Sequence, residues 1–309
     1  MSVQPDVPYF HWQVEVMIHN FIKAGINANW IDVLWAYDDE PSKEVRALAE
    51  RYNNVRFFFY KKRIIQNFGY IPILRPDTLE QHFSVYPDLS KEIVFYHDSD
   101  IIFKELPDFE KLLADDYWYV SDTISYIGAK YIRSKSDDLF EKMCEIANIK
   151  TELVDSNEDN SGGAQYLMKG PTAEYWAYVK HTALDLYKYM ANREMEERPT
   201  LTAEELKTYN PIQKWCADMW AVLWGAWRIG IETRIDDELG FSWGTSSLNE
   251  YERHKIMHNA GVTGSNDGKL FYKGEFISRS PFDADLSNVD PNTASAKYVE
   301  AVLYAKANR

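Results

Sequence analysis

The sequence predicts an α/β protein in which a mostly parallel twisted sheet is flanked by helices within a single domain. Three observations support this fold class. Strand-like segments rich in β-branched and aromatic residues alternate with helix-like segments through the N-terminal third of the chain. Hydrophobic residues make up 45% of the 309 residues, which is enough to bury a sizeable core. The chain contains no internal repeat, low-complexity stretch or linker that would divide it.

The N-terminal elements follow from local patterns. The stretch WIDVLWAY at 30–37 is typical of a buried strand, and Pro41 stands at a favourable first-turn position for the helix after it. The predicted order is helix 13–24, strand 30–37, helix 41–49, strand 55–60, helix 77–83 and strand 93–96.

The C-terminal elements are less regular. A capping box, Thr202-x-x-Glu205, predicts a short helix within the charged stretch 192–210. The other expected elements are helix 134–149, a polar loop at 155–163, a long helix from Pro171, a Trp-rich helix at 211–228, strand 231–235 and helix 293–307.

Charge and cysteine content exclude several classes of protein. The 34 basic and 48 acidic residues give a net charge of -14, which does not suit a general nucleic-acid binder. Only Cys144 and Cys216 occur, so no disulfide framework is implied and a reducing compartment fits. The N-terminus lacks the pattern of a signal peptide, and the apolar run 219–227 is too short to span a bilayer. We therefore expect no membrane association and a cytoplasmic location.

An Asp-x-Asp pair directly after a strand is the main functional signal. The segment IVFYHDSD places Asp98 and Asp100 at the carboxyl end of the predicted strand 93–96, where open α/β sheets bind ligands. Two carboxylates at this spacing can reach one hard divalent cation, which would clamp a diphosphate. Ordinary strand-end turn carboxylates are the alternative. A second copy, Asp283-x-Asp285, has no strand before it, and we interpret it as a solvated loop.

His258 is the candidate third ligand of this cation. It ends a short apolar stretch, KIMH, before a glycine-containing loop. A shell of carboxylate oxygens and imidazole favours Mn²⁺, with Mg²⁺ as the alternative. A hydrogen-bonded structural histidine is the competing interpretation.

Several other residues are candidates for ligand contacts. Arg75 could hold a phosphate through a bidentate contact, or could be a surface residue at a helix start. Gly162 and Gly163 could let the backbone approach a sugar that Gln165 contacts, or could form a plain turn.

A carboxylate and two lysines complete the set of candidates. Asp218 lies on an otherwise apolar helix face, where a carboxylate is unfavourable unless it is paired, and we expect it to bind sugar or acceptor or to act as a base. Lys269 and Lys273 could reach the diphosphate, or could be solvated.

These patterns resemble a known class of enzymes. The segment 93–103 resembles the metal-binding strand of GT-A fold glycosyltransferases. A narrower resemblance is to plant hydroxyproline O-arabinosyltransferases and peptidyl-serine galactosyltransferases. Three segments resemble theirs in the same order: YFHWQ at 9–13, LRP at 74–76 and WCADMW at 215–220. Arg75 and Asp218 stand where those enzymes have Lys and Glu.

The resemblance implies a metal-dependent transfer of a pentose or hexose from a UDP-sugar to a hydroxyl, with retention at the anomeric carbon. Residues 1–105 would then form the nucleotide-sugar half of the domain and 106–309 the acceptor half. Relatives in bacteriophages, acting in the host cytoplasm, would glycosylate hydroxymethylated pyrimidines in DNA, and we favour this acceptor over a peptidyl hydroxyproline or serine. The candidate basic face for DNA consists of Lys61, Lys62, Arg63, Lys130, Arg133 and Lys135. A nucleotidyltransferase and a non-catalytic sugar-binding protein remain as alternatives of other classes.

Overall fold

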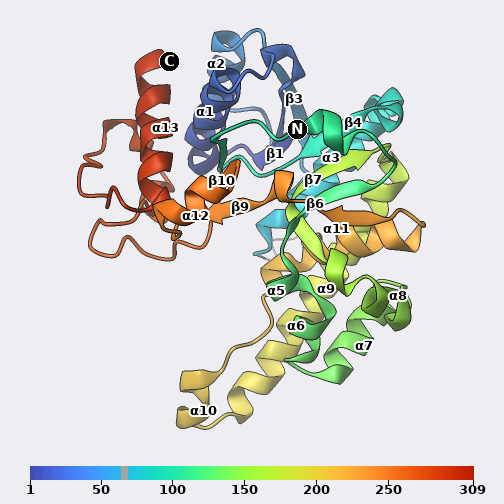
Figure 1. Cartoon of the computed structure of the whole chain (residues 1–309). Helices are drawn as coiled ribbons and strands as arrows, with labels where there is room; N and C mark the ends of the chain where they lie inside the picture. The colour runs from blue at the N-terminus through green and yellow to red at the C-terminus, as the bar shows by residue number, and fades with distance from the viewer. Residues whose placement is uncertain (64–68) are drawn as a thin grey trace. The chain divides into compact units, whose positions relative to one another are not determined.

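The chain forms two compact units that are interleaved along the sequence. The structure is a computed structural model and describes residues 1–63 and 69–309 (Figure 1). The first unit consists of Met1–Lys62, Phe95–Asp116 and Asp236–Arg309, and the second of Arg63–Val94 and Tyr117–Ile235. These boundaries differ from the expected division at residue 105, and the single domain stays a prediction.

The first unit begins with a three-stranded parallel sheet. Its strands are β1 (Ser2–Pro5), β2 (Asp32–Tyr37) and β3 (Arg56–Lys61), in the order β1-β2-β3. The helices α1 (Pro8–Lys23) and α2 (Lys43–Arg51) connect them. The Ser42 hydroxyl caps α2 by accepting a hydrogen bond from the Val45 amide.

A second sheet of the same unit includes two strands from the C-terminal part of the chain. Strand β10 (Ile256–His258) lies between β5 (Ile101–Phe103), to which it is antiparallel, and β9 (Phe241–Trp243), to which it is parallel. The remaining helices are α4 (Phe109–Leu112), α12 (Leu248–Arg253) and α13 (Ala294–Asn308). One buried cluster joins Trp12 of α1, Ile102 of β5, Met257 of β10 and Tyr298 of α13 with Phe271 and Phe276 of the segment between β10 and α13.

The second unit combines a mixed sheet with helices. Its strands are β4 (Ile93–Tyr96), β7 (Gly162–Lys169), β6 (Trp118–Asp122) and β8 (Thr233–Ile235), in the order β4-β7-β6-β8. The boundary between the two units falls within β4, after Val94. The helices are α3 (Leu74–Val85), α5 (Ile124–Ile127), α6 (Ala129–Arg133), α7 (Asp137–Ile146), α8 (Thr151–Ser156), α9 (Ala173–Glu197), α10 (Ala203–Thr208) and α11 (Ala217–Arg228).

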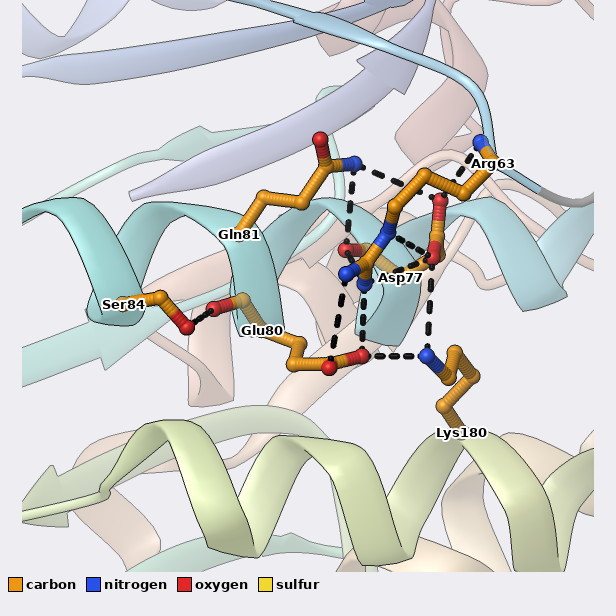
Figure 2. Close-up of polar contacts among 6 residues, drawn as sticks. All are labelled: Arg63, Asp77, Glu80, Gln81, Ser84 and Lys180. Carbon is orange, nitrogen blue, oxygen red and sulfur yellow. Dashed lines mark hydrogen bonds and ion pairs between the residues drawn. The ribbon is translucent and has the colours of Figure 1, made fainter.

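An ion-pair network joins α3 to α9 inside the second unit. Asp77 of α3 is buried, and its carboxylate accepts hydrogen bonds from the backbone amide of Arg63 at 3.2 Å and from Arg63 Nε at 2.9 Å. Glu80, one turn further along α3, pairs with Arg63 at 2.6 Å and with Lys180 of α9. Figure 2 shows both carboxylates facing the two cationic side chains. The network holds the Arg63 side chain against α3.

The structure confirms the α/β class and corrects several details. Within the described residues the strands form three small sheets instead of one, and two of them mix parallel and antiparallel pairing. The predicted loop 155–163 was wrong at both ends, because α8 reaches Ser156 and β7 begins at Gly162. The charged stretch from residue 192 begins inside α9, which continues to Glu197, and the capping box of α10 is confirmed. Among residues 1–63 and 69–309, no helix is long and apolar enough to cross a membrane.

Candidate metal centre

The Asp-x-Asp pair lies in the turn between β4 and β5 of the first unit. His97 and Ser99 are buried at 3% and 1% exposure, and Ser99 Oγ donates to Gln13 of α1 at 3.5 Å. Asp98 and Asp100, two residues apart, both lie close to the imidazole of His258.

The pairing of β5 with β10 brings His258 to the two carboxylates. In the antiparallel register His258 lies opposite Ile101, directly after Asp100. The backbone amide of Asn259 donates to the Asp100 carbonyl at 2.9 Å, which continues the pairing by one residue. On its other side the His258 ring stacks on Trp243 of β9, with ring centroids 6.2 Å apart and planes at 14°. The imidazole is thus held from both neighbouring strands.

The three side chains converge on one point. His258 Nε2 lies 3.2 Å from Asp100 Oδ1 and 3.5 Å from Asp98 Oδ2. One ligand atom from each residue lies within 4.8 Å of the others. Asp100 and His258 are each 7% exposed and Asp98 is 19% exposed, so one side of the group is open to a ligand. Two carboxylate oxygens and one imidazole nitrogen fit a divalent cation such as Mn²⁺, with positions left for other ligands.

Lys273 is the fourth member of the group. Its ammonium contacts Asp100 Oδ2, and its side chain is 17% exposed. Burial alone would raise the pKa of the Asp100 carboxyl, but the charges and hydrogen bonds of Lys273 and His258 hold that pKa well below its usual range. Burial would lower the pKa of Lys273, and the Asp100 carboxylate outweighs this effect and raises it. The pair is therefore ionised at neutral pH. Lys269, the other candidate lysine, is exposed.

Asp218 and Arg75 come together in the second unit. Asp218 is 6% exposed, and its Oδ1 accepts a hydrogen bond from Tyr70 Oη at 3.1 Å. Arg75 Nη1 lies 3.6 Å from Asp218 Oδ2. Tyr70 stacks on Tyr187 at 4.2 Å between ring centroids, and Trp215, 51% exposed, lies beside both rings. The expectation that this carboxylate needs a partner is met by a tyrosine and an arginine.

The two glycines of β7 have packing roles in the same unit. A Cβ on Gly162 would lie 2.2 Å from Val120 Cγ2 and 2.6 Å from the Ser121 carbonyl, because β6 and β7 approach closely at a register shift. A Cβ on Gly163 would lie 2.6 Å from Met219 Cε. Gln165 is fully buried, and its Oε1 accepts a hydrogen bond from Ser121 Oγ at 2.6 Å.

Two participants were missed at the level of sequence, and the contact of a third was not foreseen. Tyr70 and Trp243 carry no motif, and their roles follow from contacts between distant segments. Lys273 was expected at the diphosphate but not on Asp100 itself. The only local signal for Lys273 is that it lies between two aromatic residues, Phe271 and Phe276, that anchor its segment in the core.

Comparison with known proteins gives distant structural similarity. No family model matches the chain, and no curated protein matches its sequence. The apo structure of the bifunctional glycosyltransferase WbbM is similar over 97% of this chain and 51% of its own, with a TM-score of 0.49 and 12% identity. The chain thus spans about half the length of WbbM.

Two further solved structures are similar over most of their own length. The galactosyltransferase LgtC, in complex with donor and acceptor sugar analogs, has a TM-score of 0.45 and 9% identity, covering 97% of this chain and 94% of its own. Mouse xyloside xylosyltransferase 1 has a TM-score of 0.41 and 11% identity, covering 85% of this chain and 97% of its own. At such identities the likeness concerns the backbone alone, and the chemistry has to be argued from the residues of the site.

Proposed function

We propose that this chain is a metal-dependent GT-A glycosyltransferase that transfers a sugar from a UDP-sugar to a hydroxyl group. The observation that carries the proposal is the convergence of Asp98, Asp100 and His258 on one point, with the Lys273 ammonium beside them. A donor set of carboxylates and imidazole with an adjoining cation suits a metal-bridged diphosphate.

The residues of the first unit would act on the leaving group. Asp98, Asp100 and His258 would hold a divalent cation, which when bound supplies positive charge to the departing diphosphate. Lys273 would add a second positive charge near the same phosphate oxygens. The buried contacts of His258 with Trp243 and of Asp100 with Lys273 keep both ligands in place before the donor arrives.

Asp218 of the second unit is a proposed contact for a sugar or an acceptor. Its carboxylate could accept hydrogen bonds from sugar hydroxyls, and Arg75, whose Nη1 lies 3.6 Å from Asp218 Oδ2, could contact a phosphate. The half-exposed Trp215 offers an aromatic face beside it. Gln165 is already bonded to Ser121, so its contacts support a packing role more than contact with a sugar.

The test is donor turnover. We expect the protein with Mn²⁺ to release UDP from its UDP-sugar, EDTA to abolish this, and added Mn²⁺ to restore it. Asp100→Ala should lose turnover and remain folded by circular dichroism. Asp285→Ala is the matched control, because it removes the third residue of the exposed second Asp-x-Asp and should leave turnover unchanged. Full activity in EDTA would sink the proposal.

The products separate this function from its alternatives. A glycosyltransferase breaks the bond between the sugar and the diphosphate and releases UDP. A nucleotidyltransferase breaks a phosphoanhydride and transfers the nucleotidyl group, so it releases sugar 1-phosphate from a UDP-sugar or pyrophosphate from a nucleoside triphosphate. A sugar-binding protein releases nothing. The anomeric configuration of the fresh product, read by proton NMR, tests the retention that the family resemblance implies.

The ion pairs of the expected basic face bear on the choice of acceptor. Within the expected basic face, Lys62 pairs with Asp38 at 2.9 Å and Arg133 with Asp155 at 2.9 Å, and Arg63 belongs to the network of Figure 2. These carboxylates offset the positive charge that a duplex would need. The structure therefore supports hydroxymethylated DNA less than the sequence does. Incubation with UDP-sugars and either hydroxymethylated DNA or a hydroxyproline or serine peptide, followed by mass spectrometry, decides between the two acceptors.

A further inference from the structure

The two oxygens of the Asp100 carboxylate face different partners. Its Oδ1 lies 3.2 Å from His258 Nε2 on the side where a metal ion would bind, and its Oδ2 contacts the Lys273 ammonium. A divalent ion bound through Asp100 would therefore lie close to a fixed positive charge. Like charges a few ångströms apart in a poorly hydrated site repel strongly.

The position of Lys273 is built into the fold. It begins a 3-10 helix, η8 (Lys273–Phe276). The rings of Phe271 and Phe276 are stacked with centroids 5.5 Å apart, and each meets Trp12 of α1 edge-on. A Cβ on Gly274 would lie 2.2 Å from Cζ of Tyr272, so a larger residue there would require the Tyr272 ring to move. The two buried phenylalanines anchor the backbone on both sides of Lys273.

We propose that Lys273 is a tethered cation that competes with the divalent ion for Asp100 and thereby makes binding of the metal and of the nucleotide diphosphate cooperative. The inference rests on the proposed function. The metal alone has to displace the ammonium from Asp100 without offering it another anion. A diphosphate offers that anion, because the lysine can turn from the carboxylate to the phosphate oxygens.

Charge balance favours the same conclusion. With His258 neutral, as a metal ligand must be, Asp98, Asp100 and Lys273 together carry one negative charge. A divalent cation converts this to one positive charge in a site where all four side chains are less than a fifth exposed. A diphosphate offsets that excess, whereas the cation alone leaves it unbalanced. Removal of the lysine charge should therefore help the metal alone and weaken the coupling.

The experiment compares Mn²⁺ binding to the wild type and to Lys273→Met by isothermal titration calorimetry, with Mn²⁺ alone, with UDP, and with inorganic pyrophosphate. We expect Lys273→Met to bind Mn²⁺ alone more tightly, on the order of tenfold. We also expect the factor by which UDP or pyrophosphate tightens Mn²⁺ binding to fall by a similar amount. Equal or weaker Mn²⁺ binding by Lys273→Met, or an unchanged coupling factor, would overturn the inference.

Controls separate competition from a structural role. Lys255→Met removes another lysine of the first unit, one that pairs with Glu238 at 2.7 Å, and should leave Mn²⁺ affinity unchanged. Lys273→Arg keeps the charge and should restore the wild-type affinity for Mn²⁺ alone. If Lys273→Met does not fold, Lys273→Gln gives the same comparison with a hydrogen-bond donor retained.

Failure of the competition between Lys273 and the metal can be told apart from failure of the proposed sugar transfer. A protein that shows the expected coupling but never releases UDP from a UDP-sugar contradicts the proposed transfer and leaves the competition standing. A protein that turns over a UDP-sugar while Lys273→Met binds Mn²⁺ alone no more tightly contradicts the competition and leaves the transfer standing.

Discussion

Replacing Asp77 with asparagine should destabilise the second unit by about 2 kcal/mol, although the two side chains have nearly the same volume. The Asp77 carboxylate is 1% exposed and faces four donors among the described residues: the backbone and side chain of Arg63, Gln81 at 3.4 Å, and Lys180 at 3.7 Å (Figure 2). Asparagine removes the charge and turns one acceptor into a donor that points at other donors.

The magnitude follows from exposure and from the second acid of the network. Removing one partner of a fully buried ion pair costs about 3–5 kcal/mol. Here the Arg63 side chain is 43% exposed, and Glu80 stays in contact with both Arg63 and Lys180. Partial solvation and the remaining carboxylate reduce the loss, which gives the expected value of about 2 kcal/mol.

The assay is hydrogen exchange by mass spectrometry on peptides from α3 and α9, combined with urea unfolding. Asp88→Asn is the matched control, because Asp88 of the same unit pairs with Lys91 at 88% exposure and should change stability by less than about 0.5 kcal/mol. A loss below about 0.5 kcal/mol for Asp77→Asn, or equal protection of both helices in the two variants, would refute the reasoning.

The same network makes stability depend on pH. Burial would raise the pKa of Glu80, but hydrogen bonds and charges from Lys180 and Arg63 outweigh it and lower that pKa. A lowered folded-state pKa means that the stabilisation is fully present above the unfolded value, roughly 4.3 for a free glutamate, and is lost as the pH falls below it. The urea midpoint of the wild type should therefore drop between about pH 5 and pH 3, and that of Glu80→Gln should drop less.

Two further variants test the metal centre and the close approach of β6 and β7. His258→Ala should weaken Mn²⁺ and UDP binding together in a thermal-shift titration, and normal donor binding with a much lower melting temperature would show that His258 is structural. Gly162→Ala should lower the free energy of unfolding by about 1–3 kcal/mol, because its Cβ would meet Val120 at 2.2 Å and a carbonyl oxygen at 2.6 Å, and unchanged stability would contradict the close approach.

Strongly periodic elements were predictable from the sequence, and weakly patterned ones were not. Strand β4 (Ile93–Tyr96) has the predicted limits, and α11 and α13 agree with their predictions apart from their ends. Strand β7 was not predicted, and its first two residues were assigned to a loop because glycines are ordinarily typical of one. Their place in a strand depends on the shift in register against β6, a tertiary feature without a local signature.

The candidate metal centre was predictable in the residues that could hold a cation but not in its electrostatics. Asp98 and Asp100 follow a clear strand, and His258 ends a short apolar stretch, so each residue carries a local signal. The contact between Lys273 and Asp100 depends on the packing of Phe271 and Phe276 against Trp12, which lies far away in the sequence. Local patterns identify residues that can bind a cation, whereas the charge a cation meets there is set by long-range packing.

The two Asp-x-Asp copies show why this distinction matters for function. Both have the same spacing, but the side chain of Asp283 is 95% exposed, whereas that of Asp100 is 7% exposed and lies between His258 and Lys273. Exposed carboxylates are stabilised by water and gain little from a cation, so the second copy has no reason to bind one. Partial burial raises the free energy of the paired carboxylates of the first copy unless a positive charge compensates it. Lys273 supplies one such charge. The negative charge that remains at the open side of the group suits a divalent ion that also bridges to a diphosphate.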